Sequence, residues 1–169
     1  MKHLFLIRHA KASKDYLELT DFERPLTVKG RQDAEMMGKF LKSIPIYPDL
    51  IVSSTANRAI TTARIFAREL AYPLLNIRIK EKIYEAWVDD LINILQEIEP
   101  VYNTVLMVGH NPGFQMLAES FGEFEAGHLN TSGIIQLSCM IENWSEINEI
   151  NTNIVNYFSP KTIKPTINE

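Results

Sequence analysis

The sequence HLFLIRHA at residues 3–10 carries an apolar run that ends abruptly in Arg8 and His9. An apolar run of this length, without polar residues at alternate positions, is typical of a strand buried on both faces, as in a parallel sheet. We therefore expect a strand over residues 3–7, with the arginine and the histidine just beyond its carboxyl end.

The same pattern of a short apolar run followed by helical spacing recurs along the chain, which is typical of βα units around a parallel sheet. The predicted strands are 3–7, 49–53, 77–79, 104–108, 134–138 and 153–157. Thr27 is predicted to cap the first helix, and Asn111 to cap the last one, with Pro112 as its first residue. The expected fold is α/β, a single three-layer domain with a mostly parallel central sheet of about six strands flanked by helices.

The composition fits one globular domain with a sizeable core, since 46% of the 169 residues are apolar and 22% are charged. No repeat, low-complexity tract or linker divides the sequence. We expect a domain over residues 1–158 and an irregular C-terminal tail over residues 159–169, which contains two prolines.

Charge and composition argue against several classes of protein. A net charge of -4 makes a nucleic-acid partner unexpected. No apolar run approaches the roughly 20 residues that span a bilayer, and Arg8 interrupts the first run too early for a signal peptide. We therefore expect no membrane partner and a cytoplasmic location. Cys139 is the single cysteine, which excludes an intramolecular disulfide and a thiolate zinc site.

Chemistry-bearing residues follow three of the predicted strands. Arg8 and His9 follow the first, Arg58 lies in the opening turn of the helix after the second, and His110 follows the strand at 104–108. Ligands of parallel α/β sheets bind beyond the carboxyl ends of the strands. The sequence therefore predicts that these four side chains meet at one edge of the sheet.

These residue types favour a phosphate site over a metal site. A helix N-terminus favours an anion, and an arginine guanidinium matches phosphate oxygens with two parallel donors. Two arginines beside two histidines repel a metal cation, and no carboxylate cluster accompanies them. We expect neither a metal nor a cofactor.

Five segments together resemble the histidine phosphatase superfamily, which includes the phosphoglycerate mutases. They are LIRHAK at 6–11, RPLT at 24–27, SSTANR at 53–58, VGHNPG at 108–113 and TSG at 131–133. The short chain and the Arg-His-Ala form are most similar to the SixA-type phosphohistidine phosphatases. Ala10 stands where the superfamily more often has glycine.

The resemblance implies a phosphoglycerate mutase-like fold and roles for individual residues. It implies that His9 is the nucleophile, that Arg8 and Arg58 hold the phosphate, and that His110 donates to the phosphoryl oxygens. Glu85 is the candidate for the acid that protonates the leaving group, and a solvated loop carboxylate is the alternative.

Three further residues are candidates for the rim of the phosphate pocket. Arg24 either lines that rim or pairs with Asp21 to hold the loop. Lys11 and Ser13 follow the nucleophile and either attract an anionic substrate or belong to a solvated loop.

The predicted function is hydrolysis of a phosphomonoester or phosphoramidate through a phosphorylated histidine, with phosphohistidine on a protein as the first choice of substrate. The chain between Arg58 and His110 is short for an enclosing lid, and imidazole, with a free pKa of ~6.5, leaves without much help from an acid. The alternatives are a phosphatase for small phosphate esters and a non-catalytic module that binds phosphorylated ligands.

Overall fold

A six-stranded sheet in the order β3-β2-β4-β1-β5-β6 forms the centre of the molecule within the described residues. The structure is a computed structural model that describes residues 1–163. The strands are β1 (Lys2–Arg8), β2 (Leu50–Ser53), β3 (Arg78–Ile79), β4 (Thr104–Gly109), β5 (Ile134–Cys139) and β6 (Thr152–Phe158). The first four are parallel to one another, and β5 is antiparallel to both β1 and β6. The mostly parallel sheet is thus confirmed.

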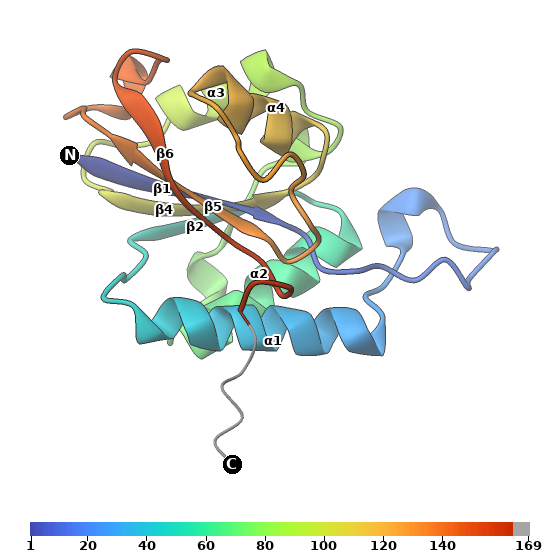
Figure 1. Cartoon of the computed structure of the whole chain (residues 1–169). Helices are drawn as coiled ribbons and strands as arrows, with labels where there is room; N and C mark the ends of the chain where they lie inside the picture. The colour runs from blue at the N-terminus through green and yellow to red at the C-terminus, as the bar shows by residue number, and fades with distance from the viewer. Residues whose placement is uncertain (164–169) are drawn as a thin grey trace.

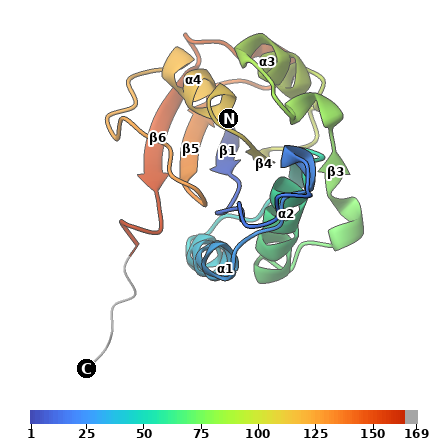
Figure 2. The same cartoon turned by 90° about the vertical axis from the view of Figure 1, so that its right-hand side faces the viewer.

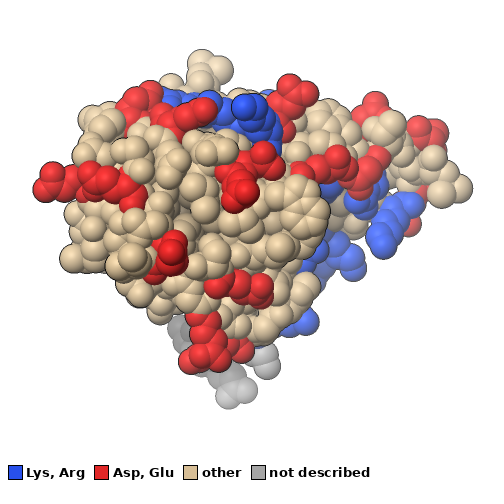
Figure 3. All heavy atoms as spheres, turned by 90° about the horizontal axis from the view of Figure 1, so that it is seen from above, with Lys and Arg blue, Asp and Glu red and all other residues tan. Residues whose placement is uncertain are grey.

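Helices cover both faces of this sheet, which makes three layers (Figures 1 and 2). On one face lie α1 (Val28–Ser43) and α2 (Asn57–Glu69), and on the other α3 (Val88–Gln96) and α4 (Gly113–Ser120). Charged side chains on the face over α3 and α4 are mostly acidic, and the basic ones lie mainly at its margins (Figure 3). The expected three-layer α/β architecture is confirmed.

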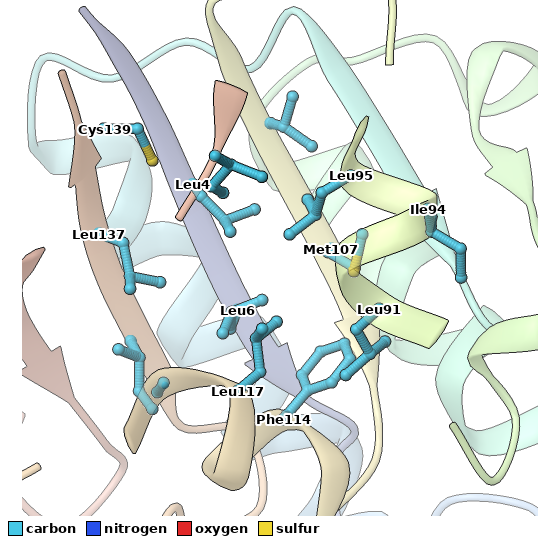
Figure 4. Packing of buried hydrophobic residues seen from close by; sticks show 14 of the residues in the cluster. Leu4, Leu6, Leu91, Ile94, Leu95, Met107, Phe114, Leu117, Leu137 and Cys139 are labelled. Atoms are coloured by element: carbon cyan, nitrogen blue, oxygen red, sulfur yellow. The ribbon is translucent and has the colours of Figure 1, made fainter. Parts of the chain in front are cut away.

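Alternate residues of β1 belong to two separate cores, one on each face of the sheet. Leu4 and Leu6 pack with α3 and α4 (Figure 4), whereas Phe5 and Ile7 pack with α1 and α2. All four side chains are fully buried. The uninterrupted apolar run at the start of the sequence therefore reflects a strand with no solvent-facing side.

The predicted cap of α1 is confirmed, whereas the predicted cap of α4 is wrong. Thr27 caps α1 as expected, and its hydroxyl accepts the amide hydrogen of Gly30 at 2.9 Å. The prediction for the last helix was wrong by one residue, because α4 begins at Gly113 with Pro112 as its cap. The Asn111 amide instead donates to the carbonyl of Leu129 at 3.2 Å, so it is not used as a helix cap.

The chain after β6 begins with a turn, in which the Ser159 carbonyl accepts from the amide of Ile163 at 3.0 Å. Residues 164–169 of the predicted tail lie outside the described residues. The boundary at residue 158 stays a prediction. No helix of the described part of the chain combines the length and the apolar character needed to cross a membrane.

Candidate active site

Arg8, His9, Arg58 and His110 lie at the carboxyl edge of the parallel strands, which faces the viewer in Figure 2. Arg8 ends β1 and is paired in register with Gly109, the residue before His110. The rings of His9 and His110 lie 5.2 Å apart, and the Arg58 Nε donates to the His9 Nε2 at 3.3 Å. The structure thus brings these four residues to one place.

Hydrogen bonds fix the protonation of the His9 ring. Its Nδ1 lies 2.7 Å from the carbonyl oxygen of Ala10, which accepts only if Nδ1 carries a hydrogen. Its Nε2 receives the Arg58 N–H and therefore presents a lone pair. The backbone is held as well, because the Ala10 amide donates to the hydroxyl of Thr62 at 2.9 Å. His9 therefore presents an unprotonated Nε2 toward Arg58.

One ring nitrogen of His110 is hydrogen-bonded within the protein, and the other has no partner among the described residues. Its Nε2 lies 2.7 Å from the Ser54 hydroxyl, which itself accepts the amide hydrogen of Ala56. In the tautomer that carries the ring hydrogen on Nδ1, the Ser54 hydroxyl donates to Nε2. Nδ1 is buried and has no hydrogen-bond partner within residues 1–163. It is therefore available as a donor to a ligand.

Burial and positive charge keep both rings neutral. Burial is the main cause that lowers the pKa of His9 to about 4, with the Ala10 carbonyl acting in the opposite direction and the charges of Arg58 and Arg8 in the same direction as burial. Burial also lowers the pKa of His110 to about 3, with His9 and Arg58 acting in the same direction. A neutral imidazole keeps the lone pair that a nucleophile needs.

We expect nitrogen-15 NMR to show both rings uncharged from pH 8 down to pH 5, with His9 carrying its hydrogen on Nδ1. The pKa values of His9 and His110 in the folded chain lie below the value of ~6.5 expected in the unfolded chain. Between these values the unfolded chain binds protons at both residues, whereas the folded chain does not. The free energy of unfolding should therefore fall as the pH drops from ~6.5 toward 4. The variants His9→Ala and His110→Ala assign the signals, and midpoints near pH 6.5 would contradict this picture.

Asp21 anchors the guanidinium of Arg58. Its backbone carbonyl accepts from the Arg58 Nη1 at 2.6 Å, and its carboxylate accepts from Nη2 at 3.0 Å. The same carboxylate is paired with Arg24 and accepts the Tyr84 hydroxyl at 2.9 Å. Of the two alternatives for Arg24, the structure shows the pairing with Asp21. Together these contacts orient Arg58 toward His9.

Arg8 is the last residue of β1 and directly precedes His9. Its Nη1 donates to the Leu129 carbonyl at 2.8 Å and lies 3.4 Å from the His128 Nε2. Its Nε is buried and lacks a partner among the described residues. Arg8 therefore keeps donor capacity for a ligand.

A pocket of about 510 Å³ lies over Arg58 and His110. Its lining consists of Asp21, Arg58, Tyr84, Glu85, Ala86, Trp87, His110, Asn111, Pro112 and Gly113. Gly113 allows the wall at 84–87 to approach α4, since a Cβ there would lie 2.2 Å from the Ala86 carbonyl oxygen. Glu85 thus reaches the pocket, although its side chain is exposed and its backbone adopts a φ of 56°.

Lys11 and Ser13 are placed differently from the four central residues. Lys11 is exposed, and its backbone carbonyl accepts from Thr27. Ser13 is buried, and its hydroxyl donates to the Asp15 carboxylate at 3.1 Å. Their contacts with a substrate stay predictions.

Three residues with contacts at the site were not given these roles by the sequence. They are Asp21, Tyr84 and Ser54. The spacing Asp-x-x-Arg indicated the pair with Arg24, but no local signal links Asp21 to an arginine 37 positions further on. No group of three or more potential metal ligands occurs in the part of the chain that the structure describes.

Comparisons with known proteins agree with this geometry. The model of the histidine phosphatase superfamily (branch 1) matches residues 4–124. An uncharacterized chloroplastic protein of Arabidopsis thaliana is 29% identical over 153 residues, covering 86% of this chain and 70% of its own. The mitochondrial serine/threonine-protein phosphatase PGAM5 of Xenopus tropicalis is 42% identical over 69 residues, 41% of this chain but only 24% of that protein.

Solved structures resemble nearly the whole molecule. The protein histidine phosphatase SixA complexed with tungstate superimposes with a TM-score of 0.81 at 23% identity, covering 96% of this chain and 99% of that one. A candidate phosphohistidine phosphatase SixA of Agrobacterium tumefaciens gives a TM-score of 0.75 at 26% identity, covering 94% and 99%. The fold is therefore phosphoglycerate mutase-like, as the sequence motifs implied.

Proposed function

The chain belongs to the histidine phosphatase superfamily, and from this premise we propose that it is a phosphatase that removes phosphoryl groups from phosphohistidine on proteins. In this proposal His9 takes the phosphoryl group and passes it to water. Arg8, Arg58 and His110 bind the phosphoryl oxygens.

One observation carries the proposal, namely the position of the His9 lone pair. The Nδ1 hydrogen is held by the Ala10 carbonyl, which leaves Nε2 unprotonated beside the Arg58 guanidinium. A neutral imidazole nitrogen next to donors for phosphate oxygens is the arrangement that in-line attack on phosphorus needs.

The reaction then proceeds in two displacements. When the phosphoryl oxygens take up the Arg58 N–H, the Nε2 lone pair of His9 is released from that hydrogen bond and forms a bond to phosphorus. The bond from phosphorus to the leaving nitrogen or oxygen breaks, and its electron pair stays with the leaving group. Water then attacks phosphorus and gives a proton to the solvent, while the bond from phosphorus to Nε2 breaks and its electron pair returns to the ring, which releases inorganic phosphate. The free N–H groups of Arg8, Arg58 and the His110 Nδ1 neutralise the charge on the phosphoryl oxygens in both steps.

The open mouth of the pocket supports a protein substrate. The chain from β2 to β4 adds only short elements beside the site, α2, β3 and α3, with two 3-10 turns. The relatives named above include a serine/threonine-protein phosphatase and a protein histidine phosphatase. The cytoplasmic location expected from the sequence stays part of this proposal.

Glu85 favours a second candidate, a phosphatase for small phosphate esters. Glu85 belongs to the same pocket lining as His110, and its side chain is exposed. An ester oxygen leaves poorly without a proton, whereas imidazole with a pKa of ~6.5 leaves readily. The phosphohistidine reaction therefore does not require Glu85 as an acid.

We expect the chain to hydrolyse a phosphohistidine-bearing protein with a higher kcat/KM than an aryl phosphate or a small alkyl phosphate ester. The measurement offers these substrates side by side at one pH and follows phosphate release. A phosphorylated enzyme that is trapped by rapid denaturation should carry its label on His9. Preference for the alkyl ester would favour the second candidate, and binding without any turnover would favour a non-catalytic module.

A further inference from the structure

The pocket lining combines buried basic residues with exposed acidic ones. The buried lining residues include Arg58 and His110, whereas the acidic lining residues Asp21 and Glu85 are exposed. Two aromatic residues, Tyr84 and the 61% exposed Trp87, belong to the same lining. A ligand that fits has an anionic end and a cationic, planar remainder.

Asp21 is the exposed acidic residue of the lining whose position is fixed. Its carboxylate is held by Arg24, Arg58 and Tyr84. Both of its oxygens already accept two hydrogen bonds each, but its side chain is 52% exposed and belongs to the pocket lining, so its charge acts on a ligand through space. Burial raises the pKa of Asp21, but the hydrogen bonds from Arg24 and Tyr84 outweigh it and hold that pKa at about 2. Asp21 is therefore ionised at neutral pH, and it is not a proton donor.

We propose that Asp21 is a specificity residue that favours phosphoryl groups bonded to a protonated, nitrogen-containing ring over phosphoryl groups bonded to oxygen. The inference rests on the proposed function, and it assigns the preference for nitrogen to one side chain. Tyr84 and Trp87 line the same pocket and offer aromatic rings to the protonated ring of the bound phosphohistidine.

The charge that the leaving group carries in the transition state explains the preference, because kcat/KM compares this state with the free enzyme and substrate. When the second ring nitrogen of phosphohistidine is protonated, cleavage of the bond from phosphorus to nitrogen returns an electron pair to the ring, which leaves as neutral imidazole. The ring charge in the transition state then lies between +1 and 0. An ester oxygen instead goes from 0 toward -1 as its bond to phosphorus breaks. A fixed carboxylate stabilises the first transition state and destabilises the second.

The test compares the ratio of kcat/KM for a phosphohistidine peptide to kcat/KM for an aryl phosphate. In Asp21→Asn we expect this ratio to fall by about tenfold or more, since a charge is removed at close range. In Arg24→Gln the Asp21 charge is less neutralised, and the ratio should rise by about threefold. Absolute rates reflect the anchoring of Arg58 as well, so the ratio is the informative quantity.

Controls separate selection from simple damage. Asp33→Asn makes the same change on α1, where Asp33 pairs with Lys29 away from the pocket lining, and should leave the ratio unchanged. Glu85→Gln should not lower the ratio as Asp21→Asn does, because Glu85 is exposed and the loss of an acid at this position would fall on the ester and not on phosphohistidine. Thermal unfolding verifies each fold, and Arg24→Gln keeps the test decisive if Asp21→Asn fails to fold.

The outcomes differ for the two proposals. A wild-type chain that hydrolyses neither substrate would overturn the proposed function and this inference with it. This inference alone would be overturned if the wild-type chain is active, Asp21→Asn lowers the rates on both substrates in parallel, and Arg24→Gln does not raise the ratio. Asp21 would then act only by positioning Arg58.

Discussion

The variant His9→Ala is expected to lose turnover by about 10⁴-fold or more, because it removes the ring nitrogen that accepts the Arg58 N–H and is proposed to take the phosphoryl group. Alanine removes the phosphoryl acceptor, and a single displacement by water lacks the positioned nucleophile. The measurement is phosphate release from a phosphohistidine peptide, together with a search for the trapped phosphoenzyme, which should be absent.

Phosphate and vanadate should still bind to His9→Ala. The anchor of Arg58 on Asp21 and that of Arg8 on Leu129 do not involve His9. His3→Ala is the matched control, since His3 lies at the opposite end of β1 and is expected to be dispensable for turnover. Near-normal rates in His9→Ala would mean that no covalent intermediate forms at this residue.

The strand ends could be predicted from sequence because the apolar runs stop abruptly at charged or polar residues. A parallel sheet then brings the ends of β1, β2 and β4 together, whatever the loops do. The four residues that follow these strand ends are Arg8, His9, Arg58 and His110. Their proximity follows from the register of the strands. The cap of α4 is displaced by one residue, because the Asn111 Nδ2 donates to the Leu129 carbonyl and its Oδ1, the atom that would cap the helix, has no partner within the described residues.

Asp21 could not be found in the same way. It lies in a short 3-10 turn within the loop that connects β1 to α1, and loop conformation depends on tertiary contacts that leave no periodic pattern. Its partners Arg58 and Tyr84 come from α2 and from the wall before α3. The sequence identifies Arg58 as a phosphate ligand by position, but the side chain that aims it is visible only in the folded chain.

Arg58→Ala and Arg8→Ala are expected to lower kcat/KM by about 10²-fold or more each, since each removes charged donors to the phosphoryl oxygens of the transition state. The loss should appear on both the phosphohistidine peptide and the aryl phosphate. Arg68→Ala, at the far end of α2, is the matched control and should retain activity. Vanadate affinity, measured in parallel, should fall with the two site variants only.

Substitution by lysine distinguishes the two arginines. Arg58 makes three separate contacts, with the His9 Nε2, the Asp21 carbonyl and the Asp21 carboxylate, which a single ammonium cannot span. Arg58→Lys should therefore recover little activity. The strongest anchor of Arg8 is one bond to the Leu129 carbonyl, so Arg8→Lys should recover more. Full recovery at both positions would show that the pocket requires only positive charge, and the planar donor geometry that connects Asp21, Arg58 and His9 would have no part in catalysis.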